Sequence, residues 1–235
     1  MNGCSTTAAG GCADPVTAQS LTRPVAAEAI GTALLLAAVV GSGIMAERLS
    51  GGNAGVALLA NAIATGGALY ALIILFGPIS GAHFNPAVTI ALAVRGMAER
   101  RAILPYVMAQ IAGGILGVWL AHLMFDLPIV HASLKARTGI GQWAGEMTAT
   151  FGLILLIVIG ARRQSTALPA AVACYIVGAY WFTSSTSFAN PAVTIARSLS
   201  DTFAGIAPIH APGFIAAQGV GLVLALLASM LFKED

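Results

Sequence analysis

Long apolar runs dominate the chain and show no strand-like alternation. Stretches of about 20 mostly hydrophobic residues, rich in Ala, Leu and Gly, recur between residues 25 and 232. A run of roughly 20 apolar residues can cross the hydrocarbon core of a bilayer as a helix, and the lack of a two-residue period disfavours strands. The pattern predicts six membrane-spanning helices: Val25–Ala46, Ala54–Phe76, Ala102–Met124, Gln142–Ala161, Ala167–Thr183 and Gly213–Phe232.

Composition supports a membrane protein. The chain is 58% hydrophobic and only 9% charged, whereas a soluble domain carries about 25% charged residues. We therefore expect an all-α protein embedded in the lipid bilayer, and the net charge of +2 gives no reason to expect nucleic acid as a partner. Residues 1–22 form a polar tail that we expect to be disordered, followed by a membrane domain over residues 23–235.

The three cysteines indicate neither a disulfide framework nor a metal site. Cys4 and Cys12 lie in the tail and Cys174 lies within a predicted membrane helix. An oxidised or metal-binding pair of Cys4 and Cys12 is the less favoured interpretation. We expect no metal and no cofactor.

Basic residues are distributed unevenly between the two sides of the predicted membrane domain. If the chain begins inside, seven face the cytoplasm: Arg23, Arg95, Arg100, Arg101, Arg162, Arg163 and Lys233. Four fall on the other side: Arg48, Lys135, Arg137 and Arg197. By the positive-inside rule, this asymmetry predicts cytoplasmic termini in a cell (inner) membrane.

One heptamer occurs twice: NPAVTIA stands at residues 85–91 and again at residues 190–196. Each copy follows a helix that carries an early acid, Glu28 or Glu146, and precedes an Ala-Gln-x-x-Gly sequence around Gln110 or Gln218. Three spans in each half place the second half in the membrane with opposite orientation. The order predicts an inverted repeat, with one half over about residues 25–125 and the other over about residues 142–232.

The heptamers predict two helices that cross only half of the membrane. Asn is a favoured helix cap and Pro is tolerated at the first helical position. Nine residues of helix span about 13 Å, roughly half of the hydrocarbon core. We therefore expect short helices over Pro86–Val94 and Pro191–Leu199, entering from opposite faces.

The two helix starts should meet near the middle of the bilayer. Each N-terminus carries about half a positive charge and unpaired N–H groups, so the pair should repel cations. The segments that lead into the helices cannot turn their carbonyls to lipid, so they should be extended and line a water-filled path. The residues expected to supply these carbonyls are Gly81, Ala82, His83, Phe84, Thr186, Phe188 and Ala189.

These motifs resemble those of the aquaporin, or major intrinsic protein, family. The resemblance rests on SGAHFNPAVT at residues 80–89, SFANPAVT at residues 187–194, the paired acids and the six-span repeat. It implies a homotetramer with one pore per subunit, pore motifs formed by two Asn-Pro-Ala triplets, and loop-bracing roles for Glu28 and Glu146. The triplets are Asn85, Pro86, Ala87 and Asn190, Pro191, Ala192.

Members of this family narrow the pore near the outer mouth with four residues. Ungapped counting from the two motifs places Thr65, Gly178, Ser187 and Val193 at this constriction. Nearly all members have Arg at the last position, so the chain resembles a bacterial member whose filter lacks that Arg. Small side chains predict a wide, uncharged constriction that admits glycerol-sized molecules and neutral metalloid acids such as arsenous acid.

Two further residues allow more than one interpretation. Arg197, four residues beyond Val193, can face the pore and restore a positive charge, or pair with Asp201 on the outer surface; the surface pair is the preferred hypothesis. His83 is expected to brace its loop by hydrogen bonds, and a pH gate at the inner mouth is the less favoured interpretation.

The function expected from these observations is a passive channel for water and small uncharged solutes, including glycerol-like molecules. Too few charged residues lie within the spans to assemble acid–base chemistry, so we expect no enzyme activity. Secondary transporters are also built from inverted repeats, so a transporter remains a competing hypothesis. A strict water channel and a structural membrane protein without transport activity also remain open.

Overall fold

The computed structural model describes residues 20–232. Nearly all of the predicted tail, with Cys4 and Cys12, and also Lys233 lie outside the described residues. The α-helices are α1 (Thr22–Leu49), α2 (Ala54–Ser80), α3 (Pro86–Val94), α4 (Ile103–Met124), α5 (Ile140–Arg162), α6 (Leu168–Phe182), α7 (Pro191–Arg197) and α8 (Ala211–Ala228). Short 3-10 turns at Arg100–Ala102 and Pro208–His210 precede α4 and α8.

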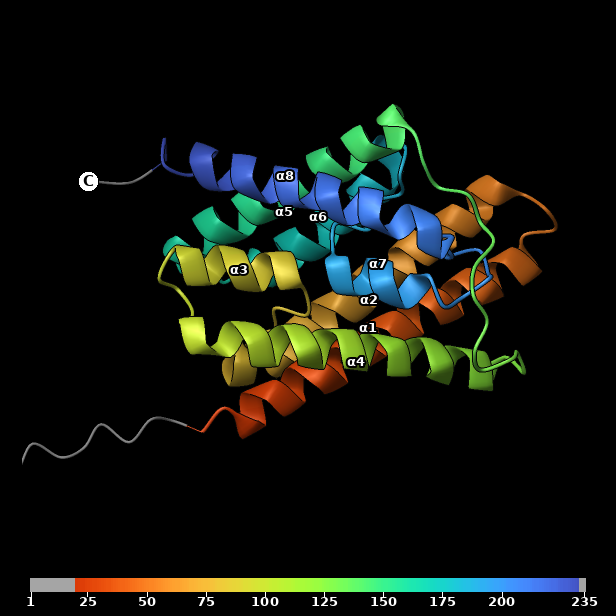
Figure 1. Ribbon diagram of the computed structural model, residues 1–235, viewed down its shortest axis with the longest axis horizontal. Helices are drawn as coiled ribbons and strands as arrows, with labels where there is room; N and C mark the ends of the chain where they lie inside the picture. The colour runs from red at the N-terminus through yellow and green to blue at the C-terminus, as the bar shows by residue number, and fades with distance from the viewer. Residues whose placement is uncertain (1–19, 233–235) are drawn as a thin grey trace, which may run out of the picture.

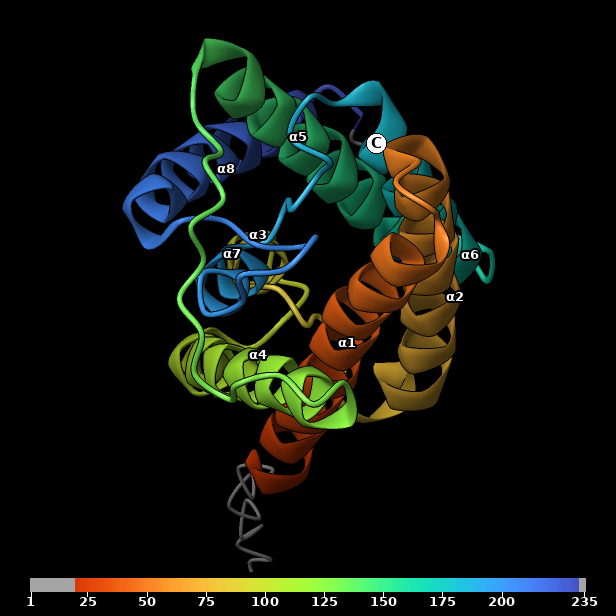
Figure 2. The same ribbon diagram turned by 90° about the vertical axis from the view of Figure 1, so that its right-hand side faces the viewer.

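The eight helices form two halves with the same order of elements. In each half, two long helices are followed by a short helix and a further long helix, so that α1–α4 correspond to α5–α8. The first helix of each half packs against the last, α1 against α4 and α5 against α8, and α2 packs on α6 between the halves. Figure 2 shows the six long helices as a ring that is completed by α3 and α7, which lie between α4 and α8.

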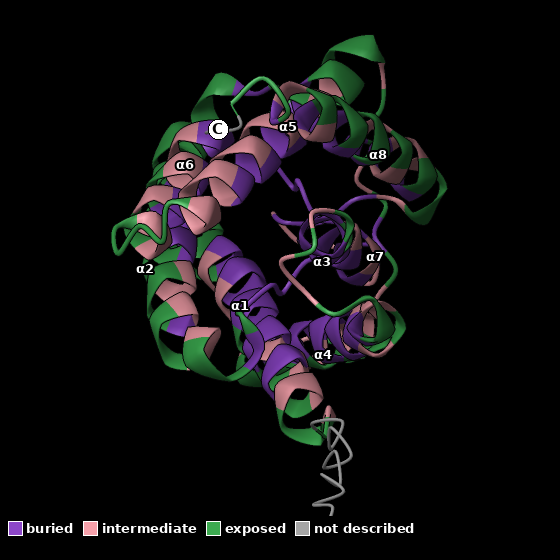
Figure 3. Ribbon diagram, turned by 90° about the vertical axis from the view of Figure 1, so that its left-hand side faces the viewer, coloured by how far each residue is buried: buried purple, intermediate pink, exposed green. Residues whose placement is uncertain are grey.

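The two heptamers form the short central helices. The predicted bounds of the first, Pro86–Val94, are those of α3, and the second ends at Arg197 rather than at Leu199. In Figure 1, α3 and α7 lie nearly end to end along the long axis of the molecule, with their starts toward the centre. Both are largely buried within the ring (Figure 3).

Within residues 20–232, five helices are long and apolar enough to cross a membrane: α1, α2, α4, α5 and α8. The predicted sixth span is α6, which has 15 residues and therefore a length of about 22 Å at 1.5 Å per residue. Large apolar side chains cover the outside of the ring, among them Leu59, Ile74, Leu116, Val223 and Leu227. An apolar exterior suits lipid rather than water, and both ends of the described chain lie at the same end of the molecule (Figure 1).

Glycines let the paired long helices approach closely. A Cβ added at Gly113 of α4 would lie 2.2 Å from the carbonyl oxygen of Ala29 in α1. Gly221 of α8 repeats the arrangement, at 2.4 Å from the carbonyl oxygen of Met147 in α5. Close backbone contact through small residues is typical of membrane helices.

We expect Gly113→Ala to destabilise the protein, because the clash is with backbone rather than with a movable side chain. Overpacking of this kind costs about 1–3 kcal/mol, which should lower the midpoint of thermal unfolding in detergent. Gly219→Ala in α8 is the matched control, since an added Cβ there meets no atom within 4 Å. Equal unfolding midpoints for the two variants would contradict the packing argument.

Candidate functional site

The starts of α3 and α7 are joined by two asparagines. Asn85 accepts a hydrogen bond from the backbone N–H of Ala87 (2.9 Å), and Asn190 accepts one from that of Ala192 (3.0 Å), so each side-chain oxygen caps its own helix. Each side-chain amide also donates to the other half, Asn85 to the carbonyl of Ala189 and Asn190 to that of Phe84, both at 2.8 Å. An Asn amide has two N–H donors, so one remains on each for a molecule in the cavity.

The segments that lead into these helices are not extended as expected, because several of their residues adopt left-handed backbone conformations. The φ angles are 84° at Gly81, 50° at Ala82 and 49° at Phe84, and 61° at Thr186, 49° at Ser187 and 47° at Ala189. These are the same three positions before each asparagine. Such φ values are uncommon outside glycine and cost about 1–3 kcal/mol each unless the surroundings impose them.

Glu28 holds the first of these segments in place. Its buried carboxylate accepts hydrogen bonds from the backbone N–H groups of His83 (2.9 Å) and Phe84 (2.7 Å), from Ser80 Oγ (2.6 Å) and from Gln110 Nε2 (2.8 Å). Four donors satisfy an acid that lipid would otherwise make very costly. The expected loop-bracing contact is therefore present at Glu28.

Glu146 does the same in the second half. It accepts from the backbone N–H groups of Phe188 and Ala189, both at 2.8 Å, and from Gln218 Nε2 at 2.6 Å. Gln110 and Gln218 also donate to the hydroxyl groups of Thr89 and Thr194, both at 2.9 Å. The repeated Ala-Gln-x-x-Gly sequence marked these glutamines, but sequence reasoning explained only the glycines and missed their amides.

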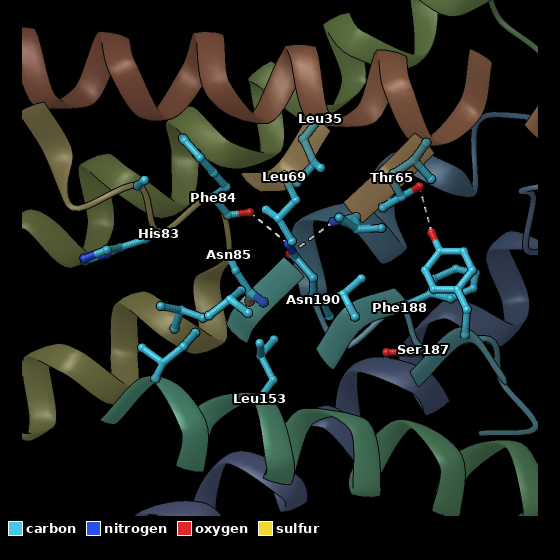
Figure 4. Close-up of a pocket in the computed structure, with 18 of the residues that line it drawn as sticks. Leu35, Thr65, Leu69, His83, Phe84, Asn85, Leu153, Ser187, Phe188 and Asn190 are labelled. Carbon is cyan, nitrogen blue, oxygen red and sulfur yellow. Dashed lines mark hydrogen bonds between the residues drawn. The ribbon is translucent and has the colours of Figure 1, made fainter. Parts of the chain in front are cut away.

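A narrow cavity passes the two asparagines. The centres of water molecules can occupy a volume of about 80 Å³ within it. At 10–15 Å³ for each water, this is room for a file of roughly five to eight waters. In Figure 4, His83 lies toward one end, Thr65 and Ser187 lie toward the other, and the asparagines lie between. The long helices and α3 supply apolar lining, which includes Leu35, Leu69, Val88, Leu153, Ile157 and Ile176.

Not all of the predicted carbonyl positions border this cavity. Its lining includes Ala82, His83, Phe84 and Phe188, but not Gly81, Thr186 or Ala189. The carbonyl of Ala189 instead accepts a hydrogen bond from the side-chain amide of Asn85. Gly81 lines a second cavity, whose lining also includes Ser20.

The sequence and the fold were compared with those of known proteins. A family profile described as "Major intrinsic protein" matches residues 16–184. The chain belongs to the major intrinsic protein family. It is 55% identical over 206 residues to "Aquaglyceroporin AqpS" of Rhizobium meliloti (strain 1021), covering 88% of each protein. It is 39% identical to "Aquaporin Z" of Bradyrhizobium diazoefficiens over 102 residues, 43% of this chain and 42% of that protein.

A solved structure has the same fold. The aquaglyceroporin from Plasmodium falciparum matches with a TM-score of 0.63 and 21% identity, over 91% of this chain and 94% of that one. Membership of the family makes this chain a multi-pass membrane protein and a passive channel for small uncharged molecules, not an enzyme. The secondary transporter is thereby set aside.

The cavity of this major intrinsic protein is lined by three of the four residues predicted for the constriction. Thr65, Ser187 and Val193 line the cavity, but Gly178 does not. Tyr180 takes its place, with its hydroxyl 3.3 Å from Thr65 Oγ1 (the dashed line beside Thr65 in Figure 4). Gly178 and Tyr180 are two residues apart and therefore lie about 200° apart around α6. Ungapped counting thus chose a face of α6 that does not line the cavity. The ring of Tyr180 partly fills the space that the small residues leave.

Arg197 lines the cavity, and its preferred pairing with Asp201 is wrong. The side chain is buried, at 2% exposure, with Nε donating to the carbonyl of Ala204 and the guanidinium 3.4 Å from the centre of the Phe188 ring. Asp201 instead accepts from the backbone N–H of Leu134 at 2.9 Å. The second hypothesis, a positive charge beside the pore, matches the geometry.

Two further cations lie near Arg197. Burial, followed by the positive charge of Arg137, lowers the pKa of Lys135, and Arg197 adds to this effect. Arg137 is 8% exposed and its guanidinium lies 5.2 Å from the centre of the Phe188 ring. Sequence reasoning counted Lys135 and Arg137 only as outer-loop charges, because nothing local shows that this loop folds inward.

His83 is braced as expected. Its Nδ1 lies 3.1 Å from Thr89 Oγ1, and its ring meets that of Tyr106 edge to face, with the centroids 5.3 Å apart. The described residues contain no cluster of three or more His, Cys, Asp or Glu side chains that could hold a metal.

Proposed function

We propose that this channel conducts glycerol and other small neutral solutes together with water. The observation that carries the proposal is Val193, which lines the cavity at the position where nearly all members of the family have Arg. Without a guanidinium at that point, the constriction keeps space that a water-selective filter fills. The 55% identity to a protein named as an aquaglyceroporin supports the same conclusion.

The mixed lining of the cavity suits a polyol. Most of the lining is apolar, and its polar members include Asn85, Asn190 and Ser187, together with the backbone before α3. The Ser187 hydroxyl has no hydrogen-bond partner within the protein. A buried polar group without a partner is costly, so a passing hydroxyl is favoured there, while the carbon backbone of the solute contacts the apolar lining.

Ions are excluded for two reasons. An ion that enters so narrow a path loses its hydration without adequate replacement. In addition, the starts of α3 and α7 direct their positive ends at the centre of the path, and Asn85 and Asn190 hold those ends together.

The proposal extends to neutral metalloid acids such as arsenous acid. At neutral pH this acid is uncharged and presents three hydroxyl groups on a body about the size of glycerol. The Ser187 hydroxyl and the asparagine amides suit such a molecule for the same reason that they suit glycerol. Tyr180 narrows the constriction more than expected from the sequence, so solutes larger than these should pass slowly.

Stopped-flow light scattering of proteoliposomes tests the proposed function. We expect purified protein to accelerate the passage of water, glycerol and arsenous acid at least about tenfold over protein-free vesicles, with rates that rise linearly with concentration. Fast water flow without glycerol or arsenous acid flow would instead establish a strict water channel.

We further propose a homotetramer in the inner membrane, with both termini in the cytoplasm. Both ends of the described chain lie at the same end of the molecule, and Arg95 and Arg162 lie there too, since both donate hydrogen bonds to Ser229 near the end of α8. These basic residues support the orientation. Light scattering of the detergent complex should give four chains of 23.7 kDa. A cysteine-specific label that cannot cross the membrane should reach a cysteine placed at Arg100 only from the inside.

A further inference from the structure

Three successive carbonyls of one loop hold three cations at the outer end of the cavity. Lys135 Nζ donates to the carbonyl of Phe203 (2.8 Å), Arg197 Nε to that of Ala204, and Arg137 Nε to that of Gly205 (2.8 Å). Two of the cations come from the loop before α5 and the third comes from α7. We call Lys135, Arg137 and Arg197 the cation triad.

The loop that holds the triad is itself tightly fixed. A Cβ added at Gly205 would lie 2.2 Å from the carbonyl oxygen of Ser200 and 2.4 Å from Ser133 Oγ. Only glycine fits this close approach. The three carbonyls therefore stand at set positions, and so do the charges they bind.

Phe188 connects the triad to the pore. Its ring contacts the guanidinium groups of both Arg137 and Arg197, and its backbone N–H is held by Glu146. Arg137 also donates through Nη1 to the carbonyl of Ser185 at 3.2 Å, in the segment that leads to α7. Arg137 thus fixes the ring on which Arg197 lies, while only Arg197 borders the cavity.

More distant carboxylates, those of Glu47, Asp201 and Glu146, offset part of the triad's charge, but among the described residues no carboxylate pairs directly with it. All three main acceptors are neutral carbonyls. A neutral acceptor satisfies the hydrogen-bonding groups of a cation without removing its charge. Near a surface the energy between charges a few ångströms apart is large enough to change an ion's passage manyfold.

We propose that the cation triad is the outer barrier to protons and cations in this channel, and that Arg197 supplies the charge missing at Val193. Arg197 lies one helical turn beyond Val193, so the positive charge is moved along the path instead of being lost. Size selection at Val193 and charge selection at Arg197 are then separate. The inference rests on the proposed function, because it places the charge barrier beside the same cavity that the neutral solutes are proposed to cross.

Proton flux across proteoliposomes tests the triad. Vesicles with an internal pH-sensitive dye are given a potassium diffusion potential with valinomycin, and water flow is recorded on the same preparation. Arg197→Gln should raise proton flux at least about tenfold, equivalent to about 1.4 kcal/mol of barrier. Arg197→Lys, which keeps the charge, should raise it much less, and Val193→Arg combined with Arg197→Gln should restore low proton flux.

Arg48→Gln is the matched control. Arg48 also donates to a backbone carbonyl, that of Phe125 (3.1 Å), and lies over the Phe125 ring, but it is exposed and does not line the cavity. Its removal should leave proton flux and water flow unchanged. If Arg197→Gln conducts no water, Arg137→Gln is the variant that tests the proposal, and its proton flux is expected to rise about threefold.

If Arg197→Gln conducts water but its proton flux is unchanged, the proposed barrier is wrong. If Arg197→Gln conducts no water, an unchanged proton flux in Arg137→Gln refutes the proposal instead. Equal flux in Arg197→Gln and Arg197→Lys would also overturn it, since shape and not charge would then be the cause. Glycerol flow in the unmodified protein tests the proposed pore independently, so the two ideas fail on different measurements.

Discussion

Glu28→Leu is expected to abolish water and solute flow and to destabilise the protein. The variant leaves the N–H groups of His83 and Phe84 and the hydroxyl of Ser80 without their acceptor, and the amide of Gln110 loses one of its two acceptors. Each buried group left unpaired costs about 1–3 kcal/mol. The strained backbone before Asn85 then loses the carboxylate that binds two of its N–H groups.

The measurement is stopped-flow water permeability per reconstituted protein, together with thermal unfolding in detergent. We expect permeability to fall more than about tenfold. Glu47→Leu is the control, since Glu47 lies on the same helix, α1, but is exposed. Glu146→Leu should be comparable, because Glu146 holds the second segment by corresponding bonds. Normal permeability in either buried-acid variant would show that the loops keep their shape without the carboxylates.

The half-membrane helices were predictable because their signals are local. An asparagine cap, a proline at the first turn and nine apolar residues fix the start, the type and the length of α3. The same signals located α7, although α7 ends two residues before the predicted end. The inverted repeat followed from the order of motifs alone, since three spans per half require opposite orientation.

The constriction was less predictable because it depends on helix rotation. Thr65, Ser187 and Val193 line the cavity, as counting from the two motifs predicted. Only residues 81–84 separate the helix of Thr65 from Asn85, whereas residues 183–189 separate α6 from Asn190. Tyr180 was missed because Thr183 and the irregular residues after it separate α6 from α7. Counting residues across an irregular segment does not identify which side of the preceding helix faces the cavity.

The cation triad was not predictable from local rules. Spacing of four residues on a helix suggested Asp201 as a partner for Arg197, but α7 ends at Arg197 itself, so Asp201 is not on the helix. The actual partners are a carbonyl seven residues away and the ring of Phe188. Arg137 reaches the same ring from 51 positions earlier in the chain, a contact that only the folded structure reveals.

Val193→Arg is expected to reduce glycerol flow at least about tenfold while water flow falls much less. The new side chain would place a long guanidinium in the constriction beside Thr65, Tyr180 and Ser187, all of which line the same cavity. A water molecule can pass such a group, but a three-carbon solute must displace it. A tenfold change corresponds to about 1.4 kcal/mol of barrier, a modest demand for a bulky side chain in so narrow a path.

Val193→Leu separates size from charge. Leucine adds one methylene and no charge, so it should lower glycerol flow slightly and leave proton flux as in the unmodified protein. If Val193→Arg and Val193→Leu reduce glycerol flow equally, added volume explains the effect and the guanidinium contributes nothing more. If neither variant changes glycerol flow, the narrowest point of the path lies elsewhere, and Tyr180 with its hydroxyl beside Thr65 becomes the residue that sets the size limit.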